Sequence, residues 1–295
     1  MKIQRVPSKW AKTTVILQNQ SLSLYVPDTR KYNLNVLKEM LALYTMVYIK
    51  PDRGSFGIGV MRAEQRTVTL SSSQQKTKIN IASNNDEIEQ QEAQILYILR
   101  YGKTAEVFFS PEELHEALQK RIQNRTYLIQ KGIDLLRHQD RPFDLRVLAQ
   151  KSPSGAWETT GMLGRVAAPQ KIITNYHSGG SILSVKILLK NHMKPSETLS
   201  TINHLKSLGV QIAGQLESTY PGIKEIGLDI AMDQHMDMWL LEVNTLPSIA
   251  VFKLFSDKSI YRKIHRYAVA YGRVKARKSP YSIRSRQSTK SQKQL

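Results

Sequence analysis

The 295-residue sequence predicts an α+β protein with two lobes, and three observations support this class. Residues 33–44 carry apolar side chains three and four positions apart, which is typical of an amphipathic helix. A glycine-rich loop at residues 54–59 runs from one strand directly into another, where a dinucleotide-binding fold would place a helix. Two strands at residues 223–232 and 237–244 are joined by a short polar turn, as in an antiparallel hairpin.

The helix predicted at residues 110–124 has the clearest start. Ser110 can cap the free amides, Pro111 suits the first turn, and Glu112 and Glu113 favour the positive helix end. We expect the other helices at residues 33–44, 87–101, 197–219 and 257–271. We expect strands at residues 46–50, 59–60, 67–70, 126–132, 144–150, 159–166, 172–176, 223–232 and 237–244.

The remaining segments complete the predicted organisation. Residues 71–85 are polar and are expected to form a loop or a strand edge, and residues from 275 onward contain too few apolar side chains to offset the entropy cost of ordering. The predicted units are an N-terminal helical segment at 1–45, a small lobe at 46–128, a large lobe at 129–272 and a basic disordered tail at 273–295.

Composition excludes several classes of protein. The chain has no cysteine, which excludes disulfides, thiolate metal sites and a cysteine nucleophile. No apolar stretch is long enough to span a membrane, and the N-terminus lacks a secretory signal, so we expect a soluble cytoplasmic protein. Of the net charge of +19, residues 253–295 carry +12, because 13 basic residues face one acidic residue there. Zinc-finger, basic-zipper and RNA-recognition signatures are absent, so we expect no specific nucleic-acid partner. Because of the net positive charge, a nucleic-acid-binding module remains a third hypothesis for the function, after the two given below.

The last hairpin carries a candidate metal site. A turn at residues 233–236 would place Asp229 opposite Leu240 and diagonal to Glu242. Because side chains alternate along a strand, Asp229, Glu242 and Asn244 would then share one face. The opposite face would be filled by Leu228, Ile230, Met232, Trp239, Leu241 and Val243. Two carboxylates and a carboxamide suit a hard cation such as magnesium, although a solvated strand face is the alternative.

Two further groups could hold anions. Lys50 ends a strand, and the glycines at 54, 57 and 59 that follow could bring backbone amides close to phosphate oxygens, or could simply form a tight turn. Arg146 and Arg165 lie on predicted strands and could hold phosphate or carboxylate oxygens, or could form surface salt bridges.

Taken in sequence order, the Lys50 strand with its glycine-rich loop, the strand arginines and the hairpin of Asp229, Glu242 and Asn244 resemble the ATP-grasp superfamily. Residues 240–247, Leu-Leu-Glu-Val-Asn-Thr-Leu-Pro, are similar to the metal-binding strand of D-alanine–D-alanine ligases and glutathione synthetases, and Asp229 stands where their other metal-binding aspartate stands. Four shorter segments resemble the YheC/YheD family, ATP-grasp proteins associated with bacterial endospore coats. They are Ser-Lys-Trp-Ala-Lys at 8–12, Val-Pro-Asp-Thr at 26–29, Arg-Pro-Phe-Asp-Leu-Arg at 141–146 and Asn-Tyr-His-Ser-Gly-Gly at 175–180.

The resemblance implies an ATP-grasp fold, in which two α+β lobes hold ATP and one or two magnesium ions between them. It implies that Lys50, with Lys9 or Lys12, binds the nucleotide and that Asp229, Glu242 and Asn244 hold the metal. Arg146 and Arg165 would stabilise the acyl-phosphate. The flap over the phosphates would include Gly54, Ser55, Phe56 and Gly57, and the edge that binds adenine would include Gln130, Lys131, Gly132 and Ile133. Members of the superfamily usually begin with a separate α/β domain, whereas 26 residues precede Pro27 here, so we expect that a full pre-ATP-grasp domain is lacking.

The function implied by the resemblance is a magnesium-dependent ligase that joins a carboxylate to an amine or a thiol through an acyl-phosphate, in spore-coat formation. Its partners would be ATP, an unidentified carboxylate and a nucleophile. The alternative is a non-catalytic, ATP-binding assembly protein that associates with spore-coat proteins.

Overall fold

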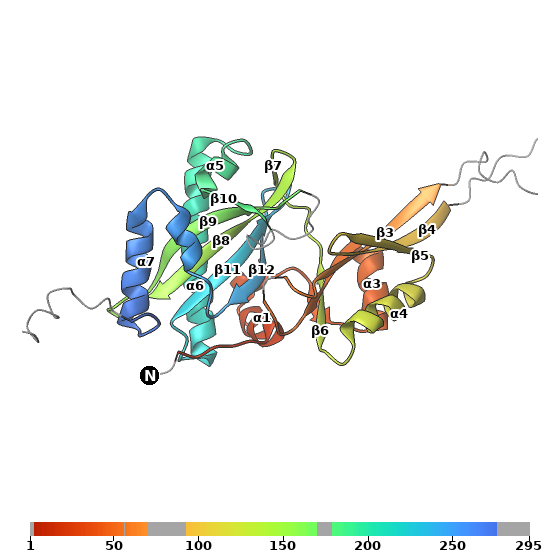
Figure 1. Ribbon diagram of the computed structural model, residues 1–295, viewed down its shortest axis with the longest axis horizontal. Helices are drawn as coiled ribbons and strands as arrows, with labels where there is room; N and C mark the ends of the chain where they lie inside the picture. Colours follow the sequence, from red (N-terminus) through yellow and green to blue (C-terminus); the bar gives the residue numbers. More distant parts are fainter. Residues whose placement is uncertain (1–2, 56, 70–92, 170–178, 276–295) are drawn as a thin grey trace, which may run out of the picture.

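The protein consists of two lobes, each built on one antiparallel sheet (Figure 1). A computed structural model describes residues 3–55, 57–69, 93–169 and 179–275 of the chain. The six-stranded sheet of the small lobe has the order β1-β6-β2-β3-β4-β5. The sheet of the large lobe has the order β10-β9-β8-β11-β12, and β7 pairs with β8 beside this path.

In the small lobe, two helices pack on the sheet around a shared apolar core. Asn33 and Ser110 cap these helices, since each side chain accepts a hydrogen bond from a first-turn amide. The core contains Leu37 and Leu41 from one helix and Leu114 and Leu118 from the other, all fully buried. The elements are β1 (Thr29–Lys31), α3 (Leu34–Tyr44), β2 (Met46–Pro51), β3 (Met61–Thr69), β4 (Ala93–Tyr101), β5 (Thr104–Phe108), α4 (Pro111–Ile122) and β6 (Tyr127–Lys131).

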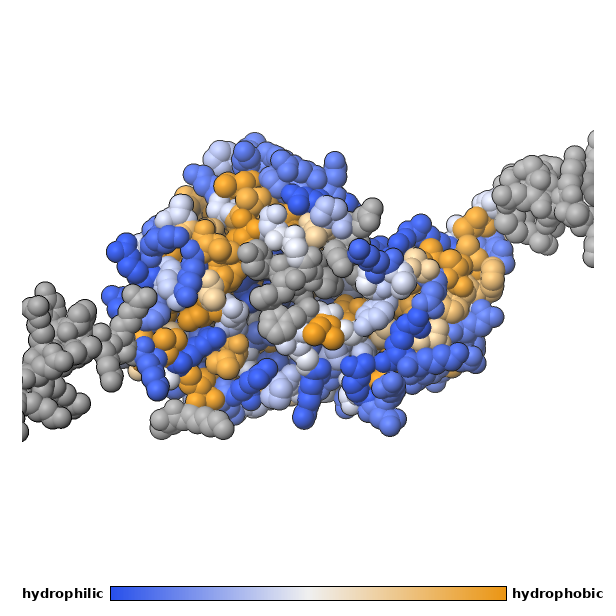
Figure 2. Space-filling model, in the orientation of Figure 1, coloured by the Kyte–Doolittle hydropathy of each residue, from blue (hydrophilic) through white to orange (hydrophobic). Residues whose placement is uncertain are grey.

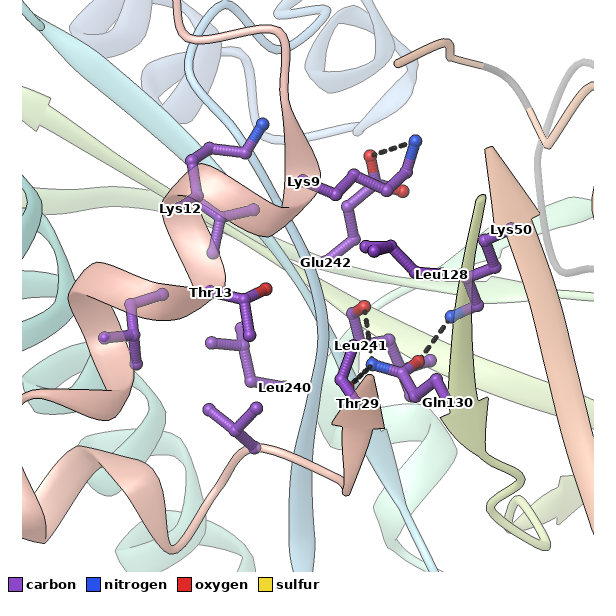
Figure 3. Close-up of a pocket in the computed structure, with 13 residues that line it drawn as sticks. Lys9, Lys12, Thr13, Thr29, Lys50, Leu128, Gln130, Leu240, Leu241 and Glu242 are labelled. Carbon is purple, nitrogen blue, oxygen red and sulfur yellow. Dashed lines mark hydrogen bonds and ion pairs between the residues drawn. The ribbon is translucent and has the colours of Figure 1, made fainter. Parts of the chain in front are cut away.

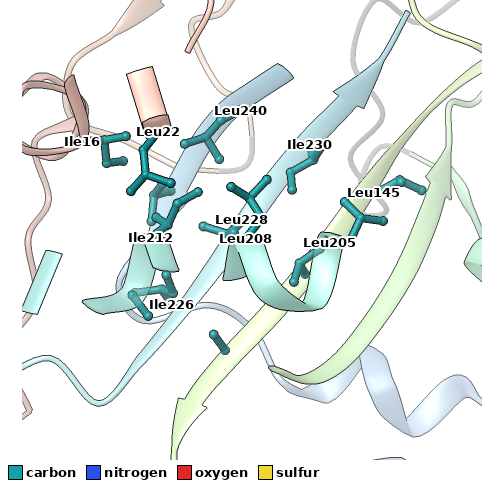
Figure 4. Close-up of a cluster of buried hydrophobic side chains, with 14 of the residues drawn as sticks. Ile16, Leu22, Leu145, Leu205, Leu208, Ile212, Ile226, Leu228, Ile230 and Leu240 are labelled. Carbon is teal, nitrogen blue, oxygen red and sulfur yellow. The ribbon is translucent and has the colours of Figure 1, made fainter. Parts of the chain in front are cut away.

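The large lobe has helices on both faces of its sheet. Leu208 and Ile212 of the long helix α6 pack with Leu228 and Ile230 of β11 on one face (Figure 4). On the other face, a 3-10 helix and α7 share a smaller apolar cluster with β8 and β9. The elements are β7 (Arg137–His138), β8 (Arg141–Lys151), β9 (Trp157–Val166), β10 (Ser181–Leu183), α5 (Val185–Leu189), α6 (Pro195–Thr219), β11 (Glu225–Met232), β12 (Met238–Asn244), η3 (Ala250–Leu254) and α7 (Lys258–Ala270).

The N-terminal segment contacts both lobes. Helix α1 (Lys9–Leu17) and the short α2 (Gln20–Ser23) contribute Ile16 and Leu22 to the main core of the large lobe. The start of α1 is held by the small lobe, because the carboxylate of Asp52, just after β2, accepts hydrogen bonds from the Ser8 hydroxyl at 2.9 Å and the Trp10 amide at 2.8 Å. Helix α1 therefore lies between the lobes (Figure 1), and its first turn faces the space that separates the two sheets.

Apolar side chains are also exposed at the far end of the small lobe. Figure 2 shows hydrophobic surface over β3, β4 and β5. The large apolar side chains exposed on these strands are Val68, Ile95, Tyr101 and Val107, which the register places on both faces of the sheet. None of the helices in the described residues combines the length and the apolar character that a membrane crossing requires.

One predicted helix is wrong. Residues 93–101, which we expected to continue a helix from residue 87, form strand β4. Ile95, Tyr97 and Ile98 are residue types that favour strands, and hydrogen-bonded pairing with β3 on one side and β5 on the other fixes the extended backbone. The strand predicted at 67–70 is confirmed for residues 67–69 as the end of β3, whereas residues 59–60, also predicted as a strand, precede β3, which begins at Met61.

The other helices and strands predicted for described residues are confirmed, with small shifts at their ends. Predictions for residues 71–85, 87–92, 172–176 and 276–295 lie outside the described residues.

The core of the large lobe can be tested with two leucines of opposite burial. Leu228→Ala on β11 should lower the free energy of unfolding by about 2–5 kcal/mol, because the side chain is fully buried and its removal leaves a cavity. Leu199→Ala on α6, where the side chain is 60% exposed, should change it by about 0.5 kcal/mol or less. Urea unfolding followed by circular dichroism measures both values. Equal effects of the two substitutions would contradict the assigned core.

Candidate functional site

A cleft of about 690 Å³ opens between the lobes. Its lining comes from the first turn of α1, from β2 and the glycine-rich loop, from the end of β6, and from one face of the large sheet. Of the residues predicted to bind ATP, metal or acyl-phosphate, the following line it: Lys12, Lys50, Gly54, Ser55, Gly57, Gln130, Lys131, Ile133, Arg146, Arg165, Asp229, Glu242 and Asn244. Gly132 does not line the cleft, and Phe56 lies outside the described residues.

Charged side chains from three neighbouring strands form a row on the floor of the cleft. Asp229 on β11 is paired in register with Glu242 on β12 and with Arg146 on β8. Directly paired residues project from the same face of a sheet. A second charged pair lies two residues along β8, where Asp144 is opposite Arg165 on β9. The predicted shared face of Asp229, Glu242 and Asn244 is therefore confirmed, since Asn244 pairs with Gly227 two positions from Asp229.

The predicted register of the hairpin is wrong, although the face is right. We expected Asp229 opposite Leu240, whereas Asp229 lies directly opposite Glu242 and Met232 lies opposite Met238. The turn is longer than predicted because the Asp233 carboxylate accepts hydrogen bonds from downstream amides, the last of them at Asp237.

An irregularity after Asp229 then shifts the register by one further residue. As a result, Leu240 is 4% exposed and belongs to the core, whereas Leu241 lines the cleft. Trp239 also lies outside the main core and carries the Lys131 ammonium 4.7 Å from its ring centroid. The prediction that Trp239 and Leu241 fill the core face was therefore wrong, while Leu228, Ile230, Met232 and Val243 are buried as predicted.

Two guanidinium groups balance the carboxylate of Asp229. The Arg146 Nε atom lies 2.5 Å from Asp229 Oδ1, and an Arg165 Nη atom lies 3.0 Å from Oδ2. Burial acts to raise the pKa of the Asp229 carboxyl, but the two arginines outweigh it, so that this pKa lies below its ordinary value. Arg165 also donates to Asp144 through Nε, at 2.8 Å from Oδ1, and through one terminal nitrogen to Oδ2. These arginines are thus held rigidly under the cleft and do not form surface salt bridges.

Lys50 enters the cleft from the small lobe. Its ammonium donates a hydrogen bond to the side-chain oxygen of Gln130 on the neighbouring strand β6 (Figure 3). The Gln130 amide nitrogen in turn donates to the Thr29 hydroxyl at 2.9 Å and to the Leu241 carbonyl at 3.5 Å. Burial lowers the pKa of Lys50 to about 8, although the nearby Glu242 acts to raise it. Gln130 therefore connects a small-lobe cation with the backbone of β12.

Helix α1 brings two more lysines to the same place. Lys9 donates to the carbonyl oxygens of Pro51 at 2.9 Å and Gly54 at 3.2 Å, and its nitrogen lies 3.8 Å from Glu242 Oε1. Lys12 is 4% exposed and donates to the Val6 carbonyl at 2.8 Å. Both line a small pocket that adjoins the cleft (Figure 3). The sequence leaves open whether Lys9 or Lys12 binds the nucleotide, and the structure places both lysines in this pocket.

The glycine-rich loop has backbone angles that other residues rarely adopt. Gly54, Gly57 and Gly59 have φ values of 139°, 73° and 78°. A Cβ atom on Gly59 would lie 2.8 Å from the Tyr127 hydroxyl oxygen, so this position has no room for a side chain. Gly54 and Gly57 line the cleft, so their amides lie within reach of a bound anion.

Gly132 has a packing role at the end of β6. Its amide donates to the Met46 carbonyl at 2.9 Å. A Cβ atom there would approach the Met46 side chain to 2.5 Å. Gly132 thereby allows β6 to leave the small lobe close beside β2, while Lys131 and Ile133 on either side line the cleft.

The three predicted metal ligands fit magnesium in donor type. Magnesium prefers oxygen donors, and Asp229, Glu242 and Asn244 supply two carboxylates and a carboxamide on one face. Glu242 has a side chain that is 24% exposed, and its cation partner Lys9 stays beyond hydrogen-bond length. The Asp229 oxygens already accept from arginines, so a metal ion there would share this carboxylate with them.

Sequence reasoning missed several residues that line the cleft. Asp144 belongs to the segment at 141–146 but was not predicted as a site residue. It lies two positions from Arg146 on one strand and so shares its face. Arg5, Arg273, Val251 and Leu254 also line the cleft. They come from opposite ends of the chain, and no local pattern in the sequence marks them.

Comparison with known proteins gives a family match over almost the whole chain. A family model described as YheC/D like ATP-grasp matches residues 3–274. The endospore coat-associated protein YheD of Bacillus subtilis (strain 168) is 26% identical over 247 residues, which cover 83% of this chain and 49% of that protein. The endospore coat-associated protein YheC of the same strain is 21% identical over 243 residues, which cover 82% of this chain and 60% of that protein. The chain thus matches about half of one relative and three fifths of the other.

Solved structures with a related fold include two synthetases at low similarity. D-cycloserine synthetase DcsG matches with 10% identity and a TM-score of 0.49, covering 90% of this chain and 69% of that chain. D-alanyl-alanine synthetase A from Vibrio cholerae O1 biovar eltor str. N16961 matches with 10% identity and a TM-score of 0.47, covering 88% of this chain and 65% of that chain. At these scores, the likeness supports no conclusion about what this chain binds.

The buried Lys12 gives a prediction about stability and pH. Burial lowers the pKa of Lys12 to about 8 from the 10.5 of an exposed lysine. Between these pH values the unfolded chain binds more protons than the folded chain, so the free energy of unfolding should rise with pH, by up to about 3 kcal/mol from this lysine. Below about pH 8 its contribution should be constant.

Urea unfolding between pH 7 and pH 10.5 tests this contribution. Lys12→Met should show a smaller rise in the free energy of unfolding than the wild type. Lys120→Met, at an exposed position on α4, should behave as the wild type does. Identical pH profiles for all three proteins would contradict the lowered pKa of Lys12.

Proposed function

The chain belongs to the YheC/D-like ATP-grasp family, and we propose that it binds ATP with magnesium and uses the ATP to activate a carboxylate for attack by an amine or a thiol. The observation that carries this proposal is the convergence of Lys50, Asp229, Glu242 and Asn244 on one cleft between the lobes. Each lobe alone presents only part of this set.

The nucleotide would lie along β12, with its base toward the start of the strand. The Lys131 ammonium lies over the Trp239 ring at this end, and the Gln130 side chain donates a hydrogen bond to the Leu241 carbonyl nearby. The backbone edge at Lys131 to Ile133 would bind adenine there. The triphosphate would extend toward Glu242 and Asn244, under the amides of Gly54 and Gly57 and beside Lys50.

Residues on the floor would provide charge stabilisation for phosphoryl transfer. Magnesium, when bound by Asp229, Glu242 and Asn244, would neutralise phosphate oxygens. Arg146 and Arg165 are oriented in advance by Asp229 and Asp144, so their guanidinium groups need little reorganisation to stabilise the transferred phosphate. An amine or thiol would then attack the acyl carbon and release phosphate.

A second candidate function is an assembly protein that binds ATP without turnover. The names of the two curated relatives favour this alternative, because both are described as endospore coat-associated. The pairing of Asp229 with two arginines is also compatible with it, because a fully neutralised carboxylate has less charge to offer a metal ion. Under either candidate we propose that the protein acts in association with the spore coat.

Glu242 provides a test of nucleotide binding. Glu242→Ala should weaken ATP binding in the presence of magnesium at least about tenfold, since it removes the more accessible of the two carboxylate ligands. Glu116→Ala, at an exposed position on α4, is the matched control and should bind as the wild type does. Isothermal titration calorimetry measures all three affinities. Unchanged affinity in Glu242→Ala would count heavily against the proposed site.

Turnover separates the two candidate functions. If the protein is a ligase, a library of carboxylates and amines should contain pairs that stimulate ADP release in the presence of magnesium. Tight binding of ATP without stimulated ADP release would favour the assembly role. A coupled assay for ADP, with the Glu242→Ala protein as the background, makes this measurement.

A further inference from the structure

The cleft extends past the residues assigned to ATP. Along β12, the order is Trp239, which contacts the cleft residue Lys131 at the proposed base end, then Glu242 and Asn244 at the proposed triphosphate end. The chain continues from Asn244 through Leu246 into η3, and this continuation still lines the cleft. Leu246 follows Asn244, the last residue of β12, and would lie past the triphosphate end of the proposed nucleotide.

The wall of this extension carries exposed apolar side chains beside the polar Thr245 and Ser248. Leu246 and Leu254 are 41% and 55% exposed, although both line a concave surface. Val251 lies between them in the chain, and Pro7 lines the same cleft from the N-terminal segment. Large apolar side chains left exposed inside a concavity are typical of ligand contacts, because filling the cavity removes them from water.

The charges that surround the wall favour an anion. The described residues that line the cleft include seven cations (Arg5, Lys12, Lys50, Lys131, Arg146, Arg165 and Arg273) and three acids (Asp144, Asp229 and Glu242). Arg273 is matched by the fully buried Glu225, which it contacts directly. A positive surplus remains after this pair is set aside, and Arg5 carries part of it at the mouth of the extension. Such a surplus suits both an anionic nucleotide and a second, smaller anion.

We propose that this extension is the acyl-donor subsite and that it takes a monocarboxylic acid with an apolar body. The inference rests on the proposed function. The aliphatic or aromatic body would pack on Leu246, Val251 and Leu254. The carboxylate would point toward Arg146 and the γ-phosphate. Acids with a polar body would bind more weakly, because hydroxyl or charged groups that face Leu246, Val251 and Leu254 would lose water without gaining partners there.

The activation step needs no reactant besides ATP and the acid. A carboxylate oxygen forms a bond to the γ-phosphorus while the bond from that phosphorus to the β,γ-bridging oxygen breaks, and ADP leaves with the electron pair. Added hydroxylamine can trap the acyl-phosphate. Its nitrogen attacks the acyl carbon, phosphate leaves with the electron pair of the carbon–oxygen bond, and one proton passes from nitrogen to solvent.

The first arm of the experiment compares hexanoate with gluconate, which has the same number of carbons and one carboxylate but a polyhydroxylated body. With magnesium, ATP and hydroxylamine, hexanoate should give hydroxamate and ADP with a kcat/KM at least about tenfold higher than gluconate. Gluconate turned over as well as hexanoate would overturn the proposed subsite while leaving the ligase function intact.

The second arm uses variants of the wall. Leu254→Gln and Leu246→Gln should each raise the KM for hexanoate about tenfold with little change in the KM for ATP. Leu199→Gln, exposed on α6 away from the cleft, is the control and should change neither value. An unchanged KM for hexanoate in both wall variants would overturn the inference.

Binding distinguishes failure of the subsite from failure of the ligase function. If no acid stimulates ADP release, hexanoate binding is measured directly. Calorimetry is used to titrate hexanoate into protein saturated with magnesium and a non-hydrolysable ATP analogue. Binding of hexanoate that Leu254→Gln weakens would retain the subsite and reject ligase turnover. Absence of hexanoate binding would reject the subsite.

Discussion

The balance of one buried carboxylate by two guanidinium groups organises the cleft. Asp229 is 7% exposed in the middle of the large sheet, where a carboxylate without partners would be strongly destabilising. Arg146 and Arg165 reach it from β8 and β9, and this is possible only because strand register places all three side chains on one face. A slip by one residue would turn Asp229 into the apolar core, so the same pairing that stabilises the lobe also fixes the site.

The two lobes are connected through polar contacts at the cleft itself. Gln130 links Lys50 to the backbone at Leu241, and Lys9 joins the glycine-rich loop to Glu242. Helix α1 has its apolar side in the large-lobe core while Asp52 of the small lobe holds its first turn. A ligand in the cleft would therefore contact groups whose positions depend on both lobes, which couples binding to the arrangement of the lobes.

Much of this arrangement could be predicted from the sequence because it follows from local patterns. Alternation along strands predicted the shared face of Asp229, Glu242 and Asn244, and capping residues predicted the start of α4. The register could not be predicted, because it depends on the bonds of the Asp233 side chain within the turn and on a local irregularity after Asp229. The apolar wall around Leu254 could not be predicted either, since its members meet only in the folded chain.

The account is tested most directly by a crystal structure of the protein with manganese and a non-hydrolysable ATP analogue. Manganese replaces magnesium at oxygen sites and can be located by its anomalous scattering. We expect the manganese peak within about 2.5 Å of oxygens from both Asp229 and Glu242, with the triphosphate beside Lys50. A nucleotide bound elsewhere, or manganese that contacts neither carboxylate, would contradict the proposal.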